Sequence, residues 1–135
     1  MNSFDPELRA TEKRRRRWLP FIVVLCVVAG AVIASNLGIG RGFFEYIDQK
    51  AGGDKAGHFF LIGGLALTLN LALRGRLVRL GPLSLQLGGV VVAVVMTLEE
   101  LSQHWIPLRE FDWGDLLANY AGIVCADWLA RRWLR

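Results

Sequence analysis

Apolar residues occur along this chain in four long runs that are separated by polar segments. The runs lie at about residues 18–35, 56–73, 83–103 and 112–131. Each run is near the length of roughly 20 residues that a helix needs to cross the hydrocarbon core of a bilayer. Backbone groups in lipid must be hydrogen-bonded within the chain, so each run is expected to be a helix. The pattern predicts an all-α membrane protein, a bundle of four transmembrane helices with short loops.

Two of the polar segments have patterns of their own. Between the second and third runs, Gly75, Gly81 and Pro82 mark a short connection. In the first loop, "GFFEYIDQK" at 42–50 brings its apolar residues together on one side of a helix. That pattern favours an interfacial helix on the outer surface, and a flexible loop is the alternative. The first eleven residues are expected to be a disordered tail.

Composition agrees with membrane insertion, and the basic residues give an orientation. Hydrophobic residues make up 53% of the chain, more than a soluble domain of this size requires. Lys and Arg number six in residues 1–17, three in 74–82 and three in 131–135, which is twelve on one side against four on the other. The positive-inside rule then places both termini in the cytoplasm. Residues 1–17 are expected to be a basic cytoplasmic tail, and residues 18–135 the transmembrane domain.

Three further features have competing interpretations. The basic run "EKRRRR" at 12–17 is typical of nucleic-acid binding when it stands alone, but here an apolar run follows directly. It is interpreted as an anchor beside a membrane helix, and no nucleic-acid partner is predicted. Residues 1–34 resemble a cleaved signal peptide, although their long apolar core favours a retained helix and cleavage would leave the other three helices oriented as before. Cys26 and Cys125 lie in apolar runs and are expected to be buried free thiols.

Polar side chains collect at the outer ends of the second, third and fourth predicted helices. Within the fourth, Asp112, Asp115 and Asn119 are spaced by three and four residues and therefore share one helical face. Ionisable groups are unfavourable against lipid, so these side chains are expected to face one another in a shared pocket. The predicted pocket residues are Asp54, Lys55, His58, Glu100, Gln103, Arg109, Asp112, Asp115 and Asn119. Four glycines are expected to let the helix backbones approach closely, namely Gly63, Gly64, Gly88 and Gly89.

Three motifs of this pocket resemble the VanZ-like family of small bacterial membrane proteins. They are "DKAGHF" at 54–59, "EELSQ" at 99–103 and "REFDWGDLLANYAG" at 109–122, and the resemblance covers about residues 50–130. Family members often have an aromatic residue four positions after the histidine, where this chain has Ile62. The resemblance implies a multi-pass protein of the bacterial cytoplasmic (inner) membrane, a role in the cell envelope, and an association with resistance to the glycopeptide teicoplanin. It does not imply a particular reaction.

The charges of the motif residues limit what the pocket can hold. Four carboxylates face two cations, Lys55 and Arg109. Like charges in a partly desolvated site cannot all ionise. Three resolutions are open, namely a protonated acid, His58 held as an imidazolium, or a bound cationic partner. His58 with Asp112 or Asp115 has the ligand types that a metal needs, but one histidine is weak support. No metal and no cofactor are predicted.

Three roles for the pocket remain open. The favoured one is binding of a lipid head group, a lipid-linked cell-wall precursor or an envelope protein, with the lipid bilayer as the surrounding partner. A second is a hydrolase or transferase acting on a lipid-linked substrate, with His58 and either Asp54 or Asp115 as general base and orienting acid. The third is a structural clamp in which Lys55 pairs with Asp112 or Asp115 and Arg109 pairs with Glu100. At the opposite ends of the helices, Asn70 is expected to bond Gln86 or water, and Asp127 to pair with Arg131.

Overall fold

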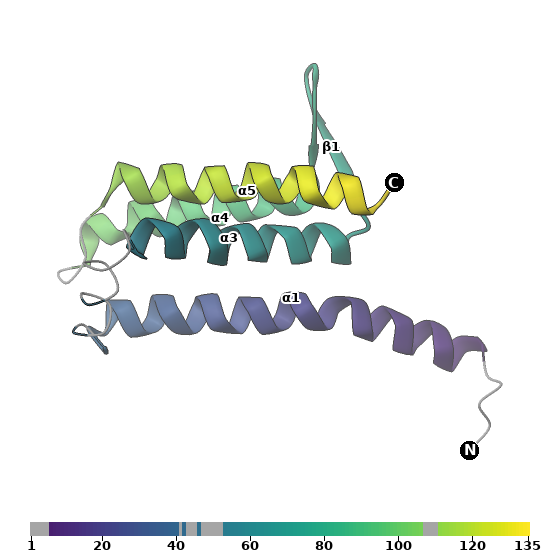
Figure 1. Cartoon of the computed structure of the whole chain (residues 1–135), viewed down its shortest axis with the longest axis horizontal. Coiled ribbons are helices and arrows are strands. Elements are labelled where there is room, and N and C mark those ends of the chain that lie inside the picture. The colour runs from purple at the N-terminus through teal and green to yellow at the C-terminus, as the bar shows by residue number, and fades with distance from the viewer. Residues whose placement is uncertain (1–5, 41, 43–45, 47–52, 107–110) are drawn as a thin grey trace.

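The computed structural model describes residues 6–40, 42, 46, 53–106 and 111–135 of the chain. In that part the chain forms four α-helices, one short 3₁₀ helix and a two-stranded antiparallel sheet. The elements in order are α1 (Pro6–Asn36), α3 (Gly53–Ala72), β1 (Leu77–Leu80), β2 (Leu83–Gln86), α4 (Leu87–Ser102), η1 (Gln103–Trp105) and α5 (Trp113–Trp133). Figure 1 shows α3, α4 and α5 packed side by side, with α1 alongside α3 and the two strands projecting from one end of the bundle.

Two of these helices are long and apolar enough to cross a membrane, judged by length and composition within the described residues. They are Glu7–Asn36, within α1, and α3. The other two helices differ from this pattern in different ways. α4 has 16 residues, which is about 24 Å of helix. α5 has 21 residues but carries two acidic and two basic side chains.

The first helix begins earlier than its apolar run predicts. α1 starts at Pro6, a residue suited to the first position of a helix because the missing N–H would have no partner there. One turn later the side chains of Glu12 and Arg16, four residues apart, form an ion pair of 3.0 Å. The prediction of a disordered tail is therefore wrong for residues 6–11, and the basic segment continues α1. The proposed interfacial helix at 42–50 falls almost wholly outside the described residues.

The connection between α3 and α4 is a β-hairpin rather than a simple turn. Leu77 pairs with Gln86 and Leu80 with Leu83, so only two residues link the strands. Gly81, the first of them, has a φ of 62°, which a glycine adopts at little cost and which a two-residue hairpin turn needs. Since β2 takes the first residues of the third apolar run, α4 begins at Leu87 and not at residue 83.

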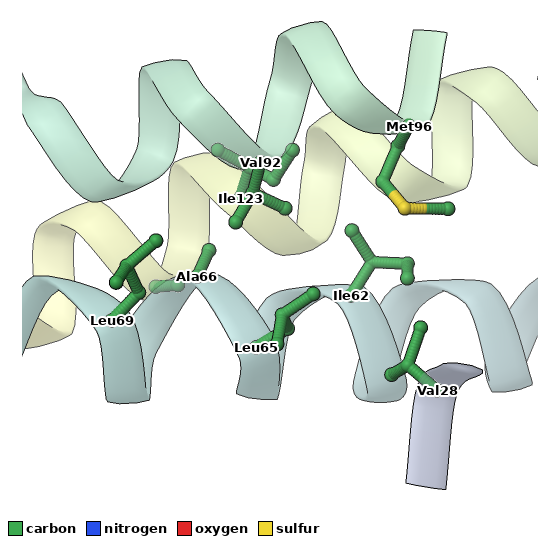
Figure 2. Close-up of a cluster of buried hydrophobic side chains, with 9 residues drawn as sticks. Val28, Ile62, Leu65, Ala66, Leu69, Val92, Met96 and Ile123 are labelled. Atoms are coloured by element: carbon green, nitrogen blue, oxygen red, sulfur yellow. The ribbon is translucent and has the colours of Figure 1, made fainter. Parts of the chain in front are cut away.

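A cluster of buried apolar side chains holds the four helices together. Figure 2 shows it at the centre of the bundle, between α3 and the helices α4 and α5. Its members are Val28 from α1, Ile62, Leu65, Ala66 and Leu69 from α3, Val92 and Met96 from α4, and Ile123 and Ala126 from α5. α1 contributes a single residue, which fits a helix that packs mainly against α3.

Glycines set the closest approach between helices, as predicted for Gly63 and Gly88. A Cβ on Gly63 would lie 3.0 Å from the carbonyl oxygen of Gly122 on α5. A Cβ on Gly122 would collide with the carbonyl oxygen of Phe59, and one on Gly88 would collide with Asn70. Gly64 differs from the prediction, since a Cβ there would meet only the side chain of Val24 at 4.0 Å. α3 and α5 are therefore in contact through their backbones.

The two cysteines are free, but the prediction that they are buried is wrong. Cys26 and Cys125 are both exposed on the surface of the chain. An apolar run predicts burial only when one face of the helix meets water. Where the surroundings are lipid, the outward face of a helix is as apolar as the inward face, so the run does not say which way a cysteine points.

Candidate functional site

Three segments that are distant in sequence bring their polar side chains together at one end of the bundle. α3 supplies them from its first turns, α4 and η1 from the end of α4, and α5 from its beginning. Eight of the nine predicted pocket residues form one connected set, called here the His58 cluster: Asp54, Lys55, His58, Glu100, Gln103, Asp112, Asp115 and Asn119. The ninth, Arg109, lies outside the described residues.

Lys55 joins the beginning of α3 to the beginning of α5. Its Nζ donates to Asp112 Oδ2 at 2.8 Å and to Asp115 Oδ1 at 3.2 Å. The predicted pairing of Lys55 with these acids is thereby confirmed for both. The Lys55 ammonium, with the N–H of Gly114, lowers the pKa of the Asp112 carboxyl. The Lys55 side chain is still 54% exposed, so its ammonium remains open to a further partner.

Asp112 serves a different purpose from the one that its spacing suggests. Its backbone is extended, with φ −122° and ψ 120°, and it is the N-cap of α5 rather than a residue of the helix. One carboxylate oxygen accepts the N–H of Gly114 at 2.6 Å, and the other accepts from Lys55. This is the usual bonding of an aspartate that caps a helix. The shared helical face therefore begins at Asp115, and Asp112 is taken up by its two donors.

His58 lies between an amide and two carboxylates. Its Nδ1 is 3.0 Å from Asn119 Oδ1. Because an amide oxygen only accepts hydrogen bonds, Nδ1 must carry the hydrogen. The other ring nitrogen, Nε2, lies 3.6 Å from Asp115 Oδ2 and 3.7 Å from Asp54 Oδ1. The two oxygens of Asp115 are thus divided, one toward Lys55 and one toward His58.

Glu100 ties α4 to the start of α5. It is fully buried, and its Oε2 accepts from Gln103 Nε2 at 3.1 Å. Its Oε1 accepts the backbone N–H of Asp112 at 3.4 Å. Burying a carboxylate is costly unless donors surround it, and these bonds reduce that cost. The predicted partner Arg109 is not among the described residues.

Asn119, like Glu100, is a fully buried polar residue of the cluster. It is 0% exposed, and its Nδ2 has no hydrogen-bond partner within the described part of the chain. A buried donor without a partner costs on the order of 1–3 kcal/mol. The bond to His58 through Oδ1 is therefore the contact that orients this amide.

Other polar residues singled out in the sequence lie outside the cluster. Ser102 Oγ donates to the carbonyl of Glu99 at 2.6 Å, a bond within its own helix, so it is not placed as a nucleophile. His104 is exposed, and its ring meets that of Trp105 edge-on with 5.8 Å between centroids. Neither residue contributes to the chemistry around His58.

A second polar set lies at the opposite end of α3 and α5 and is called here the Asp127 cluster: Asn70, Ser84, Gly89, Asp127 and Arg131. Arg131 Nε donates to Asp127 Oδ2 at 3.0 Å, as predicted, and its Nη2 donates to the carbonyl of Ser84 at 2.6 Å. Asn70 Oδ1 accepts the N–H of Gly89 at 3.0 Å, and its Nδ2 is 3.5 Å from Asp127 Oδ1. The expected bond from Asn70 to Gln86 does not form.

One grouping of metal-ligand types includes a residue that the sequence did not suggest as a metal ligand. Ligand-type atoms of Asp54, His58 and Asp115 all lie within 4.8 Å of one another. For a metal, the ligand types suggested His58 with Asp112 or Asp115, and Asp54 was expected only as a possible orienting acid for His58. The spacing of four residues, which places Asp54 and His58 on one face of α3, is the signal that makes Asp54 a third ligand candidate.

Comparisons of the chain with protein-family models, with curated proteins and with solved structures find no match. A functional assignment must therefore depend on the residues of the His58 cluster and on the motifs to which they belong.

Proposed function

We propose that this chain is a VanZ-like protein that crosses the bacterial cytoplasmic membrane four times and binds a polar head group at the outer leaflet. The proposed ligand is the head group of a lipid-linked cell-wall precursor, and the proposed site is the His58 cluster. Support comes from the three motifs, whose residues meet in one network; His58 and Asn119, which are in direct contact, are 61 positions apart in sequence. A role in the cell envelope and in teicoplanin susceptibility is part of the same proposal.

The exposed surfaces of the two less apolar helices support four spans. α4 exposes Val91, Val94, Val95 and Leu98, and α5 exposes Leu117 and Val124. Lipid would cover these side chains, whereas water would leave a large apolar surface exposed. Tryptophans lie near both ends of α5, with Trp113 at its start and Trp133 at its end, as is usual at membrane interfaces. The count of basic residues supports cytoplasmic termini and an outward-facing His58 cluster.

The observation that carries the binding proposal is that fully buried polar residues lie beside charged residues that are exposed. Glu100 and Asn119 are fully buried and fix the geometry. Asp54 and Lys55, by contrast, expose more than half of their side chains, 57% and 54%. The bonds from Lys55 to Asp112 and Asp115 would also serve a clamp, but a clamp does not need charged groups that stay accessible at the membrane boundary. A binding site requires them there.

Binding can be measured with the purified full-length chain in lipid nanodiscs. We expect a polyprenyl-diphosphate-linked cell-wall precursor to bind saturably to the wild type. In Lys55→Met, affinity should fall by about tenfold, the loss of one charged hydrogen-bond donor to a ligand. Arg131→Met is the matched control, because it removes one cation from the opposite end of the bundle. Vesicle phospholipids in place of the precursor distinguish a general head-group site from a precursor site.

The binding proposal fails if the precursor binds Lys55→Met as tightly as it binds the wild type, or if it binds neither. A structural clamp makes a different prediction for His58→Ala. Under a clamp, teicoplanin susceptibility would change only in proportion to the amount of folded protein. Under binding, it would change while the protein level and melting temperature stay near those of the wild type.

One observation favours an enzymatic role as the second candidate. His58 Nδ1 donates to Asn119, as in an imidazole oriented for general-base work, and the other ring nitrogen lies 3.6 Å from a carboxylate oxygen of Asp115. Hydrolysis or group transfer on the same lipid-linked substrate would follow. Release of product from the precursor by wild-type protein, lost in His58→Ala, would favour this role. Saturable binding without product favours the binding role.

A further inference from the structure

We propose that Asp54, His58 and Asp115 form a binding site for one divalent cation of the Zn²⁺ or Mn²⁺ type. An imidazole nitrogen with two carboxylate oxygens is a mixed ligand set that suits such ions. The three side chains come from two helices, α3 and α5, whose backbones are in direct contact. The site is thus supported by the most closely packed pair of helices in the described structure.

The distances fit a bridging ion better than they fit hydrogen bonds. His58 Nε2 is 3.6 Å from Asp115 Oδ2 and 3.7 Å from Asp54 Oδ1. A charged hydrogen bond would be about 2.7–2.9 Å long. Two ligands that lie about 2.1 Å from a zinc ion at angles of about 110–120° are about 3.4–3.6 Å apart. The third separation, between the carboxylates of Asp54 and Asp115, is at most 4.8 Å, and the Asp54 side chain is 57% exposed.

Each of the two inner ligands is oriented by a partner of its own. Asn119 Oδ1 accepts from His58 Nδ1, which leaves Nε2 as the nitrogen that faces the two carboxylates. A metal-binding histidine usually donates its other N–H to such an acceptor. Lys55 holds Asp115 Oδ1 at 3.2 Å and leaves Oδ2 toward His58. These outer contacts are what a cation site needs and what a set of solvated acids lacks.

The burial of Asn119 supports an orienting role for its side-chain amide. It is fully buried, and its Nδ2 has no partner among the residues that the structure describes. An apolar residue would fill that position in a simple packing contact without an unpaired donor. Retaining an amide there is explained if its oxygen must set the tautomer of His58.

Charge also favours a bound cation. Among the residues that the structure describes, the His58 cluster has four carboxylates, Asp54, Glu100, Asp112 and Asp115, and one lysine. A divalent ion would reduce this excess of negative charge. With Lys55 beside it, the ion would present a second positive centre to a ligand from the membrane side. This consequence depends on the proposed function, and it specifies the head group as an anionic one, phosphate or carboxylate.

Metal binding is tested on the full-length protein in detergent, after a chelator has removed adventitious ions. Titration with Zn²⁺ alone and with Mn²⁺ alone should show one site per chain. Co²⁺ as a substitute should give visible absorption bands that report a low coordination number. We expect His58→Ala and Asp115→Asn to weaken binding by about 100-fold or more. Asn119→Ala, which removes the outer contact, should weaken it by about 10- to 100-fold.

Matched variants separate this site from binding elsewhere. Asp127→Asn makes the same change as Asp115→Asn on the same helix at the opposite end, and it should bind the ion as the wild type does. His104→Ala removes the other histidine of the chain, and it should also have no effect. Asp54→Asn, at an exposed position, tests the site without disturbing packing. Wild-type circular dichroism in each variant shows that the fold is retained.

The inference is overturned if the wild type binds neither ion, or if His58→Ala and Asp54→Asn bind as the wild type does. Absence of ion binding by the wild type is the result expected if His58 is an imidazolium that pairs with the carboxylates itself. Failure of the proposed function looks different. Precursor binding that is unchanged by chelator would remove the ion from ligand recognition and leave the function standing. Ion binding without precursor binding would contradict the proposed function and leave the ion site standing.

Discussion

The His58 cluster and the Asp127 cluster lie at opposite ends of the same pair of helices and are built from similar residues. In the Asp127 cluster, Arg131 binds the Asp127 carboxylate at 3.0 Å and a hairpin carbonyl at 2.6 Å, and Asn70 uses both ends of its amide. Among the described residues of the His58 cluster, acceptors outnumber donors, and Nε2 of His58 faces two carboxylates beyond hydrogen-bond range. The comparison teaches that two polar sets on the same helices can differ in how completely their partners match. We propose that the matched set fixes structure and that the set with excess acceptors binds a ligand.

The largest expected effect comes from a substitution that should disturb both clusters. A Cβ on Gly122 would collide with the carbonyl of Phe59, so Gly122→Ala forces α3 and α5 apart. We expect the free energy of unfolding in mixed micelles to fall by about 1–3 kcal/mol, and both clusters to be disturbed. Gly30→Ala is the control, because no atom within the described residues lies within 4 Å of a Cβ there. Equal stability of the two variants would contradict the close contact.

The next effect distinguishes the two clusters by function. Asp115→Asn should make cells lose the teicoplanin phenotype and should weaken binding of the precursor by about tenfold or more, because it removes one negative charge that orients Lys55 and His58. Asp127→Asn should leave both unchanged. Both variants are compared at matched protein levels in the membrane. If they lose the phenotype to the same extent, the two clusters do not differ in the way proposed.

A smaller effect is expected on stability, where a change in the Asp127 cluster should matter, whereas precursor binding should not change. Arg131→Met removes the bond that ties β2 to α5 and the ion pair with Asp127 within α5, and we expect it to lower the free energy of unfolding by about 1 kcal/mol. Hydrogen exchange of the hairpin amides should become faster. Precursor affinity should stay at the wild-type value. A loss of affinity as large as that in Lys55→Met would show that the two ends are coupled.

The smallest effect concerns acid. Lys55 lowers the pKa of Asp112, so the Asp112 carboxylate stabilises the folded state above the pKa of the unfolded chain, about 4. That contribution is lost as pH falls through the lower, folded-state pKa. Unfolding measured from pH 6 downward should show the wild type losing more stability below about pH 4 than Asp112→Asn. Curves of the same slope would show that the Lys55 contact does not stabilise the fold.

Much of the His58 cluster could be predicted from the sequence, because helical periodicity and depth are local properties. A spacing of four residues places His58 on the same face of α3 as Asp54, and Asn119 on the same face of α5 as Asp115. The cost of a charge against lipid then directs these faces toward each other. That argument brought eight of the nine residues together correctly, and it predicted the pairing of Lys55.

The predictions from the sequence were wrong where a local pattern of residues is compatible with more than one structure. Residues 77–86 are rich in leucine and alternate with polar side chains only over 83–86, so a turn and a hairpin were both compatible with them. Asp112 follows the helical spacing but lies one residue before α5, where a cap replaces the helix. The cysteines were misplaced because an apolar run does not specify a direction when lipid is outside. In each case the deciding contact comes from another part of the chain.

By itself, the sequence determined that this chain forms long apolar helices with polar groups at matching ends, since hydropathy and periodicity are written into neighbouring residues. Only the tertiary structure decided which oxygen faces which nitrogen. Lys55 takes one oxygen of Asp115, and His58 faces the other, because Gly63 and Gly122 let α3 and α5 approach within backbone contact. Distances of that kind are set by packing between segments about 60 residues apart, and no local pattern encodes them.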